Sequence, residues 1–322
     1  MTLSTILLWL LAALFLVAAF VAGYFILVTR RIAAEAERKV PPAGKFIDVD
    51  GNRIHYVDQG EGRPIVFVHG LGAQLLQFRH PLFDRLDGFR LIALDRPGSG
   101  YSSRVAGASG RLPEQAQVLR HFIEKLGLEK PLIVGHSLGG AITLALALDH
   151  PDTISGIALM SPLTHRAESV PAEFQGLYIK SPLQRWLLAN TVAVPMAMKY
   201  AQQTLAFIFG PQGVPADYIV KGGGMLGLRP SHIYATSTDF VAVEEDLGQL
   251  EARYGEIKLP VAILFGTGDR VLDHKVQLAA IEGKVPGIDI QLLDGIGHMP
   301  QFTATAEAVA FIRKMAGRVL AA

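Results

Sequence analysis

The apolar positions of this chain follow two patterns. From Leu3 to Val28 the sequence reads LSTILLWLLAALFLVAAFVAGYFILV, without a charged side chain and without an amphipathic period. From about residue 44 onward, short runs rich in Val, Ile, Leu and Phe alternate with longer stretches of helical character. The first pattern is typical of a helix that crosses a membrane, and the second of an α/β domain with a mainly parallel sheet.

The N-terminal apolar run is long enough to cross the roughly 30 Å hydrocarbon core of a bilayer as a helix. A cleaved signal peptide is the main alternative, but it would carry a basic n-region, a shorter apolar core and a cleavage site of small residues, and no Lys or Arg precedes this run. A buried core helix would need an amphipathic period. We therefore expect residues 1–29 to form a single-pass transmembrane anchor and residues 30–43 to form a short linker.

Basic residues follow the apolar run and do not precede it; they are Arg30, Arg31, Arg38 and Lys39. Because the cytoplasmic flanks of membrane spans carry an excess of Lys and Arg, we expect the rest of the chain to lie in the cytoplasm. The opposite topology stays open, since large domains are also translocated against this bias. The short linker keeps the following domain close to the lipid surface, which makes a substrate delivered by the bilayer plausible.

The alternating part of the chain predicts the order of its strands and helices. Two strands flank a hairpin turn at Asp50-Gly51-Asn52, and the later strands read as apolar runs buried on both faces. Residues 162–254 are helical or loop-like in character and contain no obvious strand. We expect a core formed by residues 44–161 and 255–322, with residues 162–254 inserted as a helical cap. The expected strands are 46–50, 54–58, 65–68, 91–94, 131–135, 154–160, 261–265 and 288–293, and the expected helices are 113–126, 138–149, 274–282 and 306–320.

Composition excludes several classes of function. The chain has 30 basic and 29 acidic residues and no dense run of Lys or Arg, so nothing favours binding to nucleic acid. It contains no Cys, which excludes disulfides, Cys-ligated metals and a thiol nucleophile. The glycines of residues 95–102 lack the pattern of a phosphate-binding loop. We expect neither a cofactor nor a metal.

One short motif carries candidate chemistry. Gly135-His136-Ser137-Leu138-Gly139 lies where an apolar strand meets an apolar helix. Two glycines around a Ser permit a sharp turn that exposes the hydroxyl at the positive end of the helix, as a nucleophilic Ser requires. We therefore predict that Ser137 is the nucleophile of a hydrolase.

With its surroundings, this motif gives the chain a resemblance to the α/β-hydrolase family from about residue 44 to the C-terminus. The resemblance implies an α/β-hydrolase fold, a mostly parallel sheet flanked by helices. One position departs from the family, because Thr303 stands where an acidic residue often follows the catalytic His. The motifs that carry the resemblance are Val68-His69-Gly70-Leu71-Gly72, Asp95-Arg96-Pro97-Gly98-Ser99-Gly100-Tyr101-Ser102, Gly135-His136-Ser137-Leu138-Gly139-Gly140, Phe265-Gly266-Thr267-Gly268-Asp269-Arg270-Val271 and Gly295-Ile296-Gly297-His298-Met299-Pro300.

The resemblance also implies roles for individual residues. Family members carry nucleophile, acid and histidine in that chain order, which Ser137, Asp269 and His298 follow. His298 would then be the general base and Asp269 would orient it. The backbone N–H groups of Leu71 and Leu138 would bind the oxyanion.

Other acids and histidines fit these roles less well. Asp239 lies in the expected cap, Asp273 one helical turn beyond Asp269, and Asp294 too close to His298 in sequence. Three histidines also receive non-catalytic interpretations: His274 as part of a solvated face, and His136 and His69 as packing or hydrogen-bonding groups.

The reaction expected from these residues is acyl transfer to water through an acyl-enzyme. A Ser nucleophile argues against the dehalogenase and epoxide-hydrolase branches, which use Asp at that position. An apolar cap and a nearby membrane favour a carboxylic ester, lipid-like in character, as the substrate. Carbon–carbon bond hydrolysis and perhydrolysis use the same triad and stay open, as does a membrane-anchored binding protein without turnover. The oligomeric state is not readable from the sequence.

Overall fold

The computed structural model describes residues 2–166 and 171–320 and is built around one eight-stranded sheet within them. The strand order is β1-β2-β4-β3-β5-β6-β7-β8. The first hairpin is antiparallel, β2 pairs antiparallel with β4, and the remaining pairs are parallel. The strands are β1 Lys45–Val49, β2 Asn52–Gln59, β3 Arg63–Val68, β4 Phe89–Leu94, β5 Leu132–His136, β6 Gly156–Met160, β7 Val261–Gly266 and β8 Asp289–Leu293.

Helices cover both faces of this sheet, which is why its central strands are apolar at nearly every position. In β3, Ile65 and Phe67 pack in one buried cluster, whereas Val66 and Val68 pack in the cluster on the other face. The first face is covered by α2 Leu76–Leu82 and α10 Thr305–Val319, and the second by α3 Leu112–Lys125 and α4 Leu138–Asp149. The predicted α/β domain with a mainly parallel sheet is thus confirmed.

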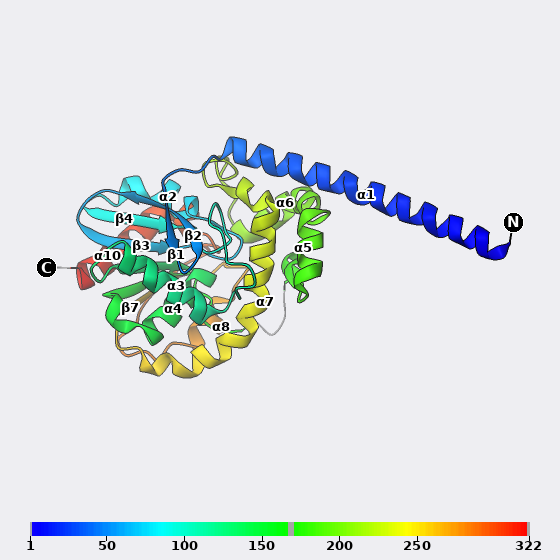
Figure 1. Cartoon of the computed structure of the whole chain (residues 1–322). Coiled ribbons are helices and arrows are strands. Elements are labelled where there is room, and N and C mark those ends of the chain that lie inside the picture. Colours follow the sequence, from blue (N-terminus) through cyan, green and yellow to red (C-terminus); the bar gives the residue numbers. More distant parts are fainter. Residues whose placement is uncertain (1, 167–170, 321–322) are drawn as a thin grey trace.

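The segment between β6 and β7 is helical among its described residues. It contains α5 Pro182–Asn190, α6 Ala193–Phe209 and α7 Pro230–Arg253. In Figure 1, α7 runs between the sheet on one side and α5 and α6 on the other. Residues 167–170 of the predicted cap lie outside the described residues. The remaining short helices of the molecule are α8 His274–Ala279, α9 Pro300–Thr303, η1 Phe83–Arg85, η2 Pro151–Thr153, η3 Ala172–Leu177, η4 Gly224–Leu228 and η5 Tyr254–Glu256.

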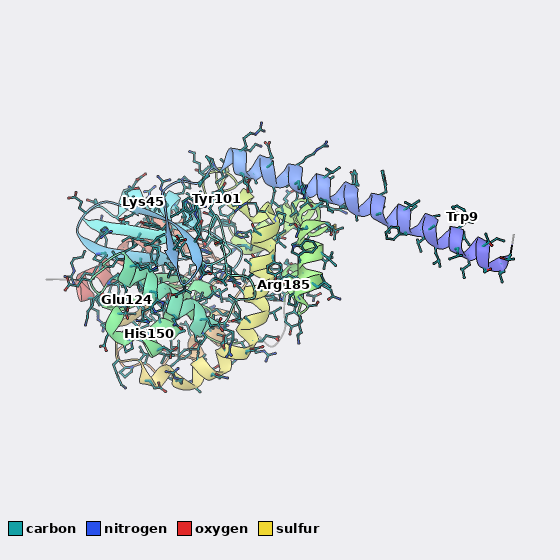
Figure 2. The ribbon with its side chains drawn as sticks, in the orientation of Figure 1. Trp9, Lys45, Tyr101, Glu124, His150 and Arg185 are labelled. Carbon is teal, nitrogen blue, oxygen red and sulfur yellow. The ribbon has the colours of Figure 1, made fainter. Side chains whose placement is uncertain are left out.

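The N-terminal helix α1 extends from Leu3 to Lys39 and projects away from the rest of the molecule (Figure 1). In the part of the chain that the structure describes, it is the one helix long and apolar enough to cross a membrane. Figure 2 shows Trp9 on the projecting part, far from the sheet. Signal sequences share this length and composition.

The expected linker over residues 30–43 is helical for most of its length, because α1 continues without a break to Lys39. Apart from Ile32, residues 30–39 are Arg, Ala, Glu and Lys, which are strong helix formers, and Glu35 pairs with Arg38 and Lys39 one turn later. The helix ends before Pro41 and Pro42, which cannot continue it.

Three contacts fix the C-terminal part of α1 to the domain. The Thr29 hydroxyl donates to the carbonyl of Thr191 at 2.5 Å. Glu37 accepts from Arg229 at 2.7 Å, and the Tyr101 hydroxyl donates to the Val40 carbonyl at 2.6 Å. The helix also packs on α5, α6 and η4, so it is joined to the domain along its side.

Candidate active site

The parallel strands end at a common edge of the sheet, and three of the predicted site residues follow strands that end there. Ser137 follows β5 directly, Asp269 follows β7 after a short turn, and His298 lies in the loop after β8. The loops at this edge bring together residues that are far apart in sequence, which makes the edge a candidate reaction centre.

The backbone at Ser137 is left-handed, with φ 53° and ψ −121°. Two neighbouring glycines make this turn possible. A Cβ on Gly139 would lie 2.1 Å from the Val68 carbonyl oxygen, and one on Gly135 would lie 2.6 Å from the Thr143 hydroxyl. Only glycine fits at either position, and the helix α4 therefore starts directly against β3 with Ser137 at its N-terminus.

Asp269 and His298 form a buried hydrogen-bonded pair. The Asp269 Oδ2 and His298 Nδ1 atoms are 2.7 Å apart, and the Asp269 carboxylate is fully buried. Its other oxygen, Oδ1, accepts hydrogen bonds from the backbone N–H groups of Val271 and Leu272 at 2.8 and 2.9 Å. With both carboxylate oxygens engaged, the imidazole is held in place, and its Nε2 has no hydrogen-bond partner among the described residues.

Ser137 and His298 both line one cavity of about 990 Å³. Among the described residues no hydrogen bond joins the Ser137 hydroxyl to His298, and such bonds often tighten only when substrate binds. Most of the lining comes from helices between β6 and β7, including Met196, Tyr200 and Phe240. The cavity thus joins the sheet edge to an apolar space under these helices.

Leu71 and Leu138 also line this cavity. Leu138 is the first residue of α4, where a backbone N–H has no partner within the helix. The hydrogen bonds found among residues 2–166 and 171–320 leave the N–H groups of Leu71 and Leu138 without an acceptor. Two backbone donors are therefore available beside Ser137.

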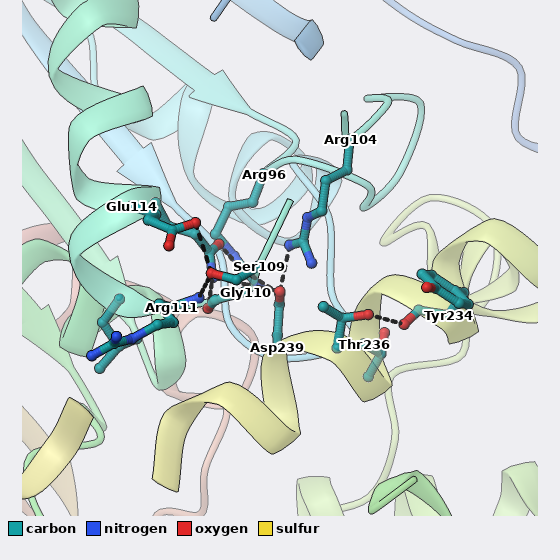
Figure 3. A network of polar contacts seen from close by, with 12 residues as sticks. Arg96, Arg104, Ser109, Gly110, Arg111, Glu114, Tyr234, Thr236 and Asp239 are labelled. Carbon is teal, nitrogen blue, oxygen red and sulfur yellow. Dashed lines mark hydrogen bonds and ion pairs between the residues drawn. The ribbon is translucent and has the colours of Figure 1, made fainter. Parts of the chain in front are cut away.

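Arg96, Arg104 and Asp239 belong to a buried polar network (Figure 3), and Arg96 joins this network to the loop that carries Leu71. Arg96 donates from Nε to the His69 carbonyl and from Nη2 to the Gly70 carbonyl, both at 3.0 Å. Its Nη1 contacts Asp239 Oδ2 at 2.6 Å, and Arg104 contacts the other oxygen of the same carboxylate. No role for Arg96 was predicted from the sequence, and Asp239 was considered there only as a rejected catalytic acid.

Three buried histidines near the site are held in the neutral form. Desolvation, with the nearby His298, lowers the pKa of His136 to about 3, and desolvation lowers the pKa of His232 to about 4. Burial and the neighbouring Arg96 guanidinium lower the pKa of His69 well below its usual value. His136 donates to the His298 carbonyl at 2.8 Å and accepts from Gln77. Each of these histidines is thus a hydrogen-bonding group in the structure.

No group of three or more His, Asp or Glu side chains within the described ranges is arranged to hold a metal ion.

Comparison with known proteins places these features in a family. The sequence model described as the alpha/beta hydrolase fold matches residues 63–305. Haloalkane dehalogenase 2 of Mycobacterium bovis is 35% identical over 119 residues, which cover 37% of this chain and 42% of that protein. The 2-hydroxy-6-oxononadienedioate/2-hydroxy-6-oxononatrienedioate hydrolase of Paraburkholderia phymatum is 24% identical over 78% of this chain and 86% of its own.

Among solved structures, a membrane phospholipase A described as a bacterial virulence factor superposes with a TM-score of 0.71. It is 22% identical in sequence, and the match covers 99% of this chain and 100% of that one. At this level of identity the similarity establishes the fold and leaves the substrate undetermined.

The buried neutral histidines predict a loss of stability in acid. A histidine whose pKa is lowered on folding binds its proton more readily in the unfolded chain, so its contribution is complete above about pH 6.5 and declines as the pH falls towards its folded value. For His136 that window extends down to about pH 3. We expect the Tm of the detergent-solubilised protein to fall steadily below pH 6.5.

The variant His136→Gln isolates this effect. It should melt below the wild type at pH 7.5, because it loses buried hydrogen bonds, but the difference in Tm should shrink as the pH is lowered towards 5. Parallel curves for the two proteins, measured by differential scanning fluorimetry, would contradict the assignment of a neutral His136.

Proposed function

Because the chain belongs to the α/β-hydrolase family, we propose that it is a serine hydrolase that cleaves a carboxylic ester through an acyl-enzyme on Ser137. One observation carries the proposal: a serine on a strained strand-to-helix turn shares a cavity with a histidine that is hydrogen-bonded to a buried carboxylate. Relatives of this family that carry an Asp nucleophile catalyse dehalogenation, and Ser137 supports acyl transfer instead.

The proposed mechanism assigns one step to each group. His298 Nε2 removes the proton from the Ser137 hydroxyl as the oxygen attacks the ester carbonyl, and later returns the proton to the leaving alcohol. Asp269 holds the tautomer with a proton on Nδ1 and stabilises the imidazolium. The N–H groups of Leu71 and Leu138 bind the oxyanion. In the second half of the reaction His298 removes a proton from a water molecule that attacks the acyl carbonyl, and returns it to the Ser137 oxygen as the acid is released.

The cavity supports a lipid-like ester as the substrate. It is large enough for an acyl chain and is lined mainly by apolar side chains of residues 162–254, which we propose to be a helical cap. Two of the charged groups on its lining, Arg166 and Glu244, form an ion pair at 3.2 Å. A third, Arg185, donates its hydrogen bonds to Ser237, Thr238 and the Ile179 carbonyl, so these groups offer no strong clamp for a charged substrate.

We also propose that α1 anchors the protein in a membrane by a single span. Apart from Thr5, its residues from Leu3 to Ala22 are exposed, and many are large and apolar. The exposed Arg30 and Arg31 follow the span, which supports a cytoplasmic catalytic domain. The packing of α1 along the domain argues against removal as a signal sequence, since cleavage would strip a buried face. The membrane phospholipase of similar fold is compatible with this arrangement.

Hydrolysis of a carbon–carbon bond is the second candidate. It uses the same triad, and the curated hydrolase of Paraburkholderia phymatum, which aligns over most of both chains, supports it. That hydrolase is named for a dioate substrate, which carries two carboxylates, whereas the cavity described here is mainly apolar. An ester is therefore the first candidate.

The nucleophile is tested by a fluorophosphonate probe, which labels activated serines covalently. The wild-type chain should be labelled and Ser137→Ala should not, while both hold the same Tm within error. In parallel, only the wild type should release p-nitrophenol from esters, with higher turnover on medium or long acyl chains than on acetate. Equal labelling of the two proteins would mean that Ser137 is not the nucleophile.

The acid is tested by Asp269→Asn, which keeps the shape of the side chain but favours the wrong tautomer of His298. Turnover should fall by about 10⁴-fold, as in other Ser-His-Asp triads, with little change in KM. Asp294→Asn serves as the control, because Asp294 lies exposed in the same region and contacts Thr267 instead of His298. Near-normal turnover of Asp269→Asn would move the acid to another residue.

A further inference from the structure

The helix α5 is amphipathic in the reverse of the usual sense. Its one charged residue, Arg185, is labelled in Figure 2 and is only 6% exposed. It donates to Ser237, Thr238 and the Ile179 carbonyl. On the opposite face Leu183, Trp186 and Leu187 are 67%, 55% and 46% exposed. A helix at a water-facing surface has the opposite arrangement, so the surroundings of this face are apolar in some state of the protein.

The exposed face of α5 lies beside the end of the apolar run of α1. On one side of α1 the residues lose exposure from about Phe25 onward, and the helix packs on α5 and α6. Thr29 is hydrogen-bonded to Thr191, which lies between these two helices. The segment from Leu3 to Ala22 is free of these contacts and, at about 1.5 Å per residue, spans about 30 Å, the thickness of the hydrocarbon core. A bilayer that contains this segment ends where α5 begins.

We propose that the outer face of α5, together with Met198 on α6, is immersed in the headgroup and upper acyl region of the bilayer that holds α1. This docking face consists of Leu183, Trp186, Leu187, Leu188 and Met198, all exposed in the structure. Its Trp is the residue type most enriched at membrane interfaces, and the exposed Lys180 and Lys199 flank it with positive charge towards lipid phosphates.

The docking face and the cavity lie on opposite sides of the same two helices. Arg185 and Ala189 of α5 and Met196 and Tyr200 of α6 line the cavity that contains Ser137. Immersion of the outer face therefore brings the cavity within one helix diameter of the lipid, which shortens the path of an acyl chain from the bilayer to Ser137. This inference rests on the proposed function for its catalytic consequence, but the docking itself is independent of any activity.

Docking is tested by the fluorescence of Trp186 in the full-length chain. The protein contains two tryptophans, so Trp9→Phe leaves Trp186 as the single reporter. In vesicles of phosphatidylcholine brominated near the headgroup end of the acyl chains, Trp186 should lose about half of its emission relative to unbrominated vesicles, as expected for a helix buried in the interface.

The matched control moves the reporter to the far end of the molecule. In Trp9→Phe/Trp186→Phe/Arg318→Trp the single Trp lies on α10, at the opposite end from α5 in Figure 1, and should not be quenched. An unquenched Trp186 in vesicle-bound protein would overturn the proposal. A blue-shifted Trp186 without bromine quenching would overturn it as well, in favour of a second copy of the chain on this face.

Catalysis gives a second test. Leu183→Ser/Leu187→Ser should hydrolyse an ester embedded in vesicles at least about tenfold more slowly than the wild type, since two leucines no longer enter lipid. Hydrolysis of a short soluble ester by this variant should be unchanged. The control is Val276→Ser/Leu292→Ser, which replaces two exposed apolar side chains on α8 and β8 and should hydrolyse both substrates at the wild-type rate. Equal rates on vesicles would contradict docking, whereas a wild type inactive on every ester would contradict the proposed function and leave the quenching result standing.

A second, independent inference concerns Arg96 and Asp239, which lie next to the loop that carries Leu71. The Gly70 carbonyl and the Leu71 N–H belong to the same peptide unit and point in opposite directions. Arg96 and the His69 ring, at 2.8 Å, both donate to the Gly70 oxygen, and Arg96 also holds the His69 carbonyl. The geometry points to Arg96 as a positioning residue that aims the Leu71 N–H into the cavity.

Asp239 ties this peptide to the helix that lines the cavity. Asp239 lies on α7, whose Thr236 and Phe240 line the cavity. Its carboxylate pairs with the buried Arg96 guanidinium, whose pKa is lowered by desolvation. A shift of α7 therefore moves Arg96 and the peptide together, which couples the helices over the cavity to the oxyanion site. The catalytic effect again rests on the proposed function.

The variant Arg96→Lys keeps the charge beside Asp239 but loses the two-pronged contact with the loop. We expect kcat to fall about 10²-fold with KM little changed, and the affinity for a trifluoromethyl ketone inhibitor to fall in parallel. Arg104→Lys is the matched control, because Arg104 shares the same carboxylate without touching the loop. Equal losses in both variants, or a change in KM alone, would overturn the inference.

A readout that needs no turnover completes this test. In a crystal structure of Arg96→Lys the Gly70–Leu71 peptide should rotate or become disordered, while Asp239 keeps its place on α7. An unmoved peptide would contradict the positioning role even if the wild type proved inactive on esters, whereas a wild type unlabelled by fluorophosphonate would contradict only the proposed function.

Discussion

The arrangement at the sheet edge depends on a left-handed residue at Ser137. This backbone conformation costs a residue other than glycine on the order of 1–3 kcal/mol, and it persists only where the surrounding structure enforces it. Here Ser137 donates its N–H to the Met160 carbonyl and accepts at its own carbonyl from Leu163, which ties it to the end of β6. The packing of α4, buried at ten successive positions, offsets the strain. The direction of α4 and the free N–H of Leu138 both follow from this turn.

Sequence alone predicted the features that have a local signal. Apolar runs and turn residues predicted the strands to within about two residues, and the glycines around Ser137, Asp269 and His298 pointed to positions that the structure places at one edge of the sheet. The pair Arg96–Asp239 had no such signal, because its members are 143 residues apart and each looks like an ordinary surface charge. One clue was present. Asp239 and Asp246 recur at helical spacing on the buried side of α7, and carboxylates on such a side need buried cations as partners.

The length of α1 and the orientation of α5 could not be predicted from their own segments of the sequence. The change from apolar to charged residues at Thr29 predicted the end of the span. The following residues also favour helix, and α1, which packs on η4, α5 and α6, continues to Lys39. The orientation of α5 could not be read from its sequence, since the pattern PLQRWLLAN fits Arg185 outward as well as inward. Only the buried acceptors around Arg185 decide between the two.

The unbroken course of α1 restricts how a membrane-held form of this protein can move. A flexible tether would let the catalytic domain sample all tilts and distances above the bilayer, but a continuous helix clamped at Thr29, Glu37 and Val40 transmits the tilt of the span directly to the domain. If its substrate lies in the same bilayer, as proposed, the two meet in two dimensions. The rate of such an enzyme responds to the mole fraction of substrate in the surface that it occupies, and dilution of that surface with inert lipid slows it even when the bulk concentration is unchanged.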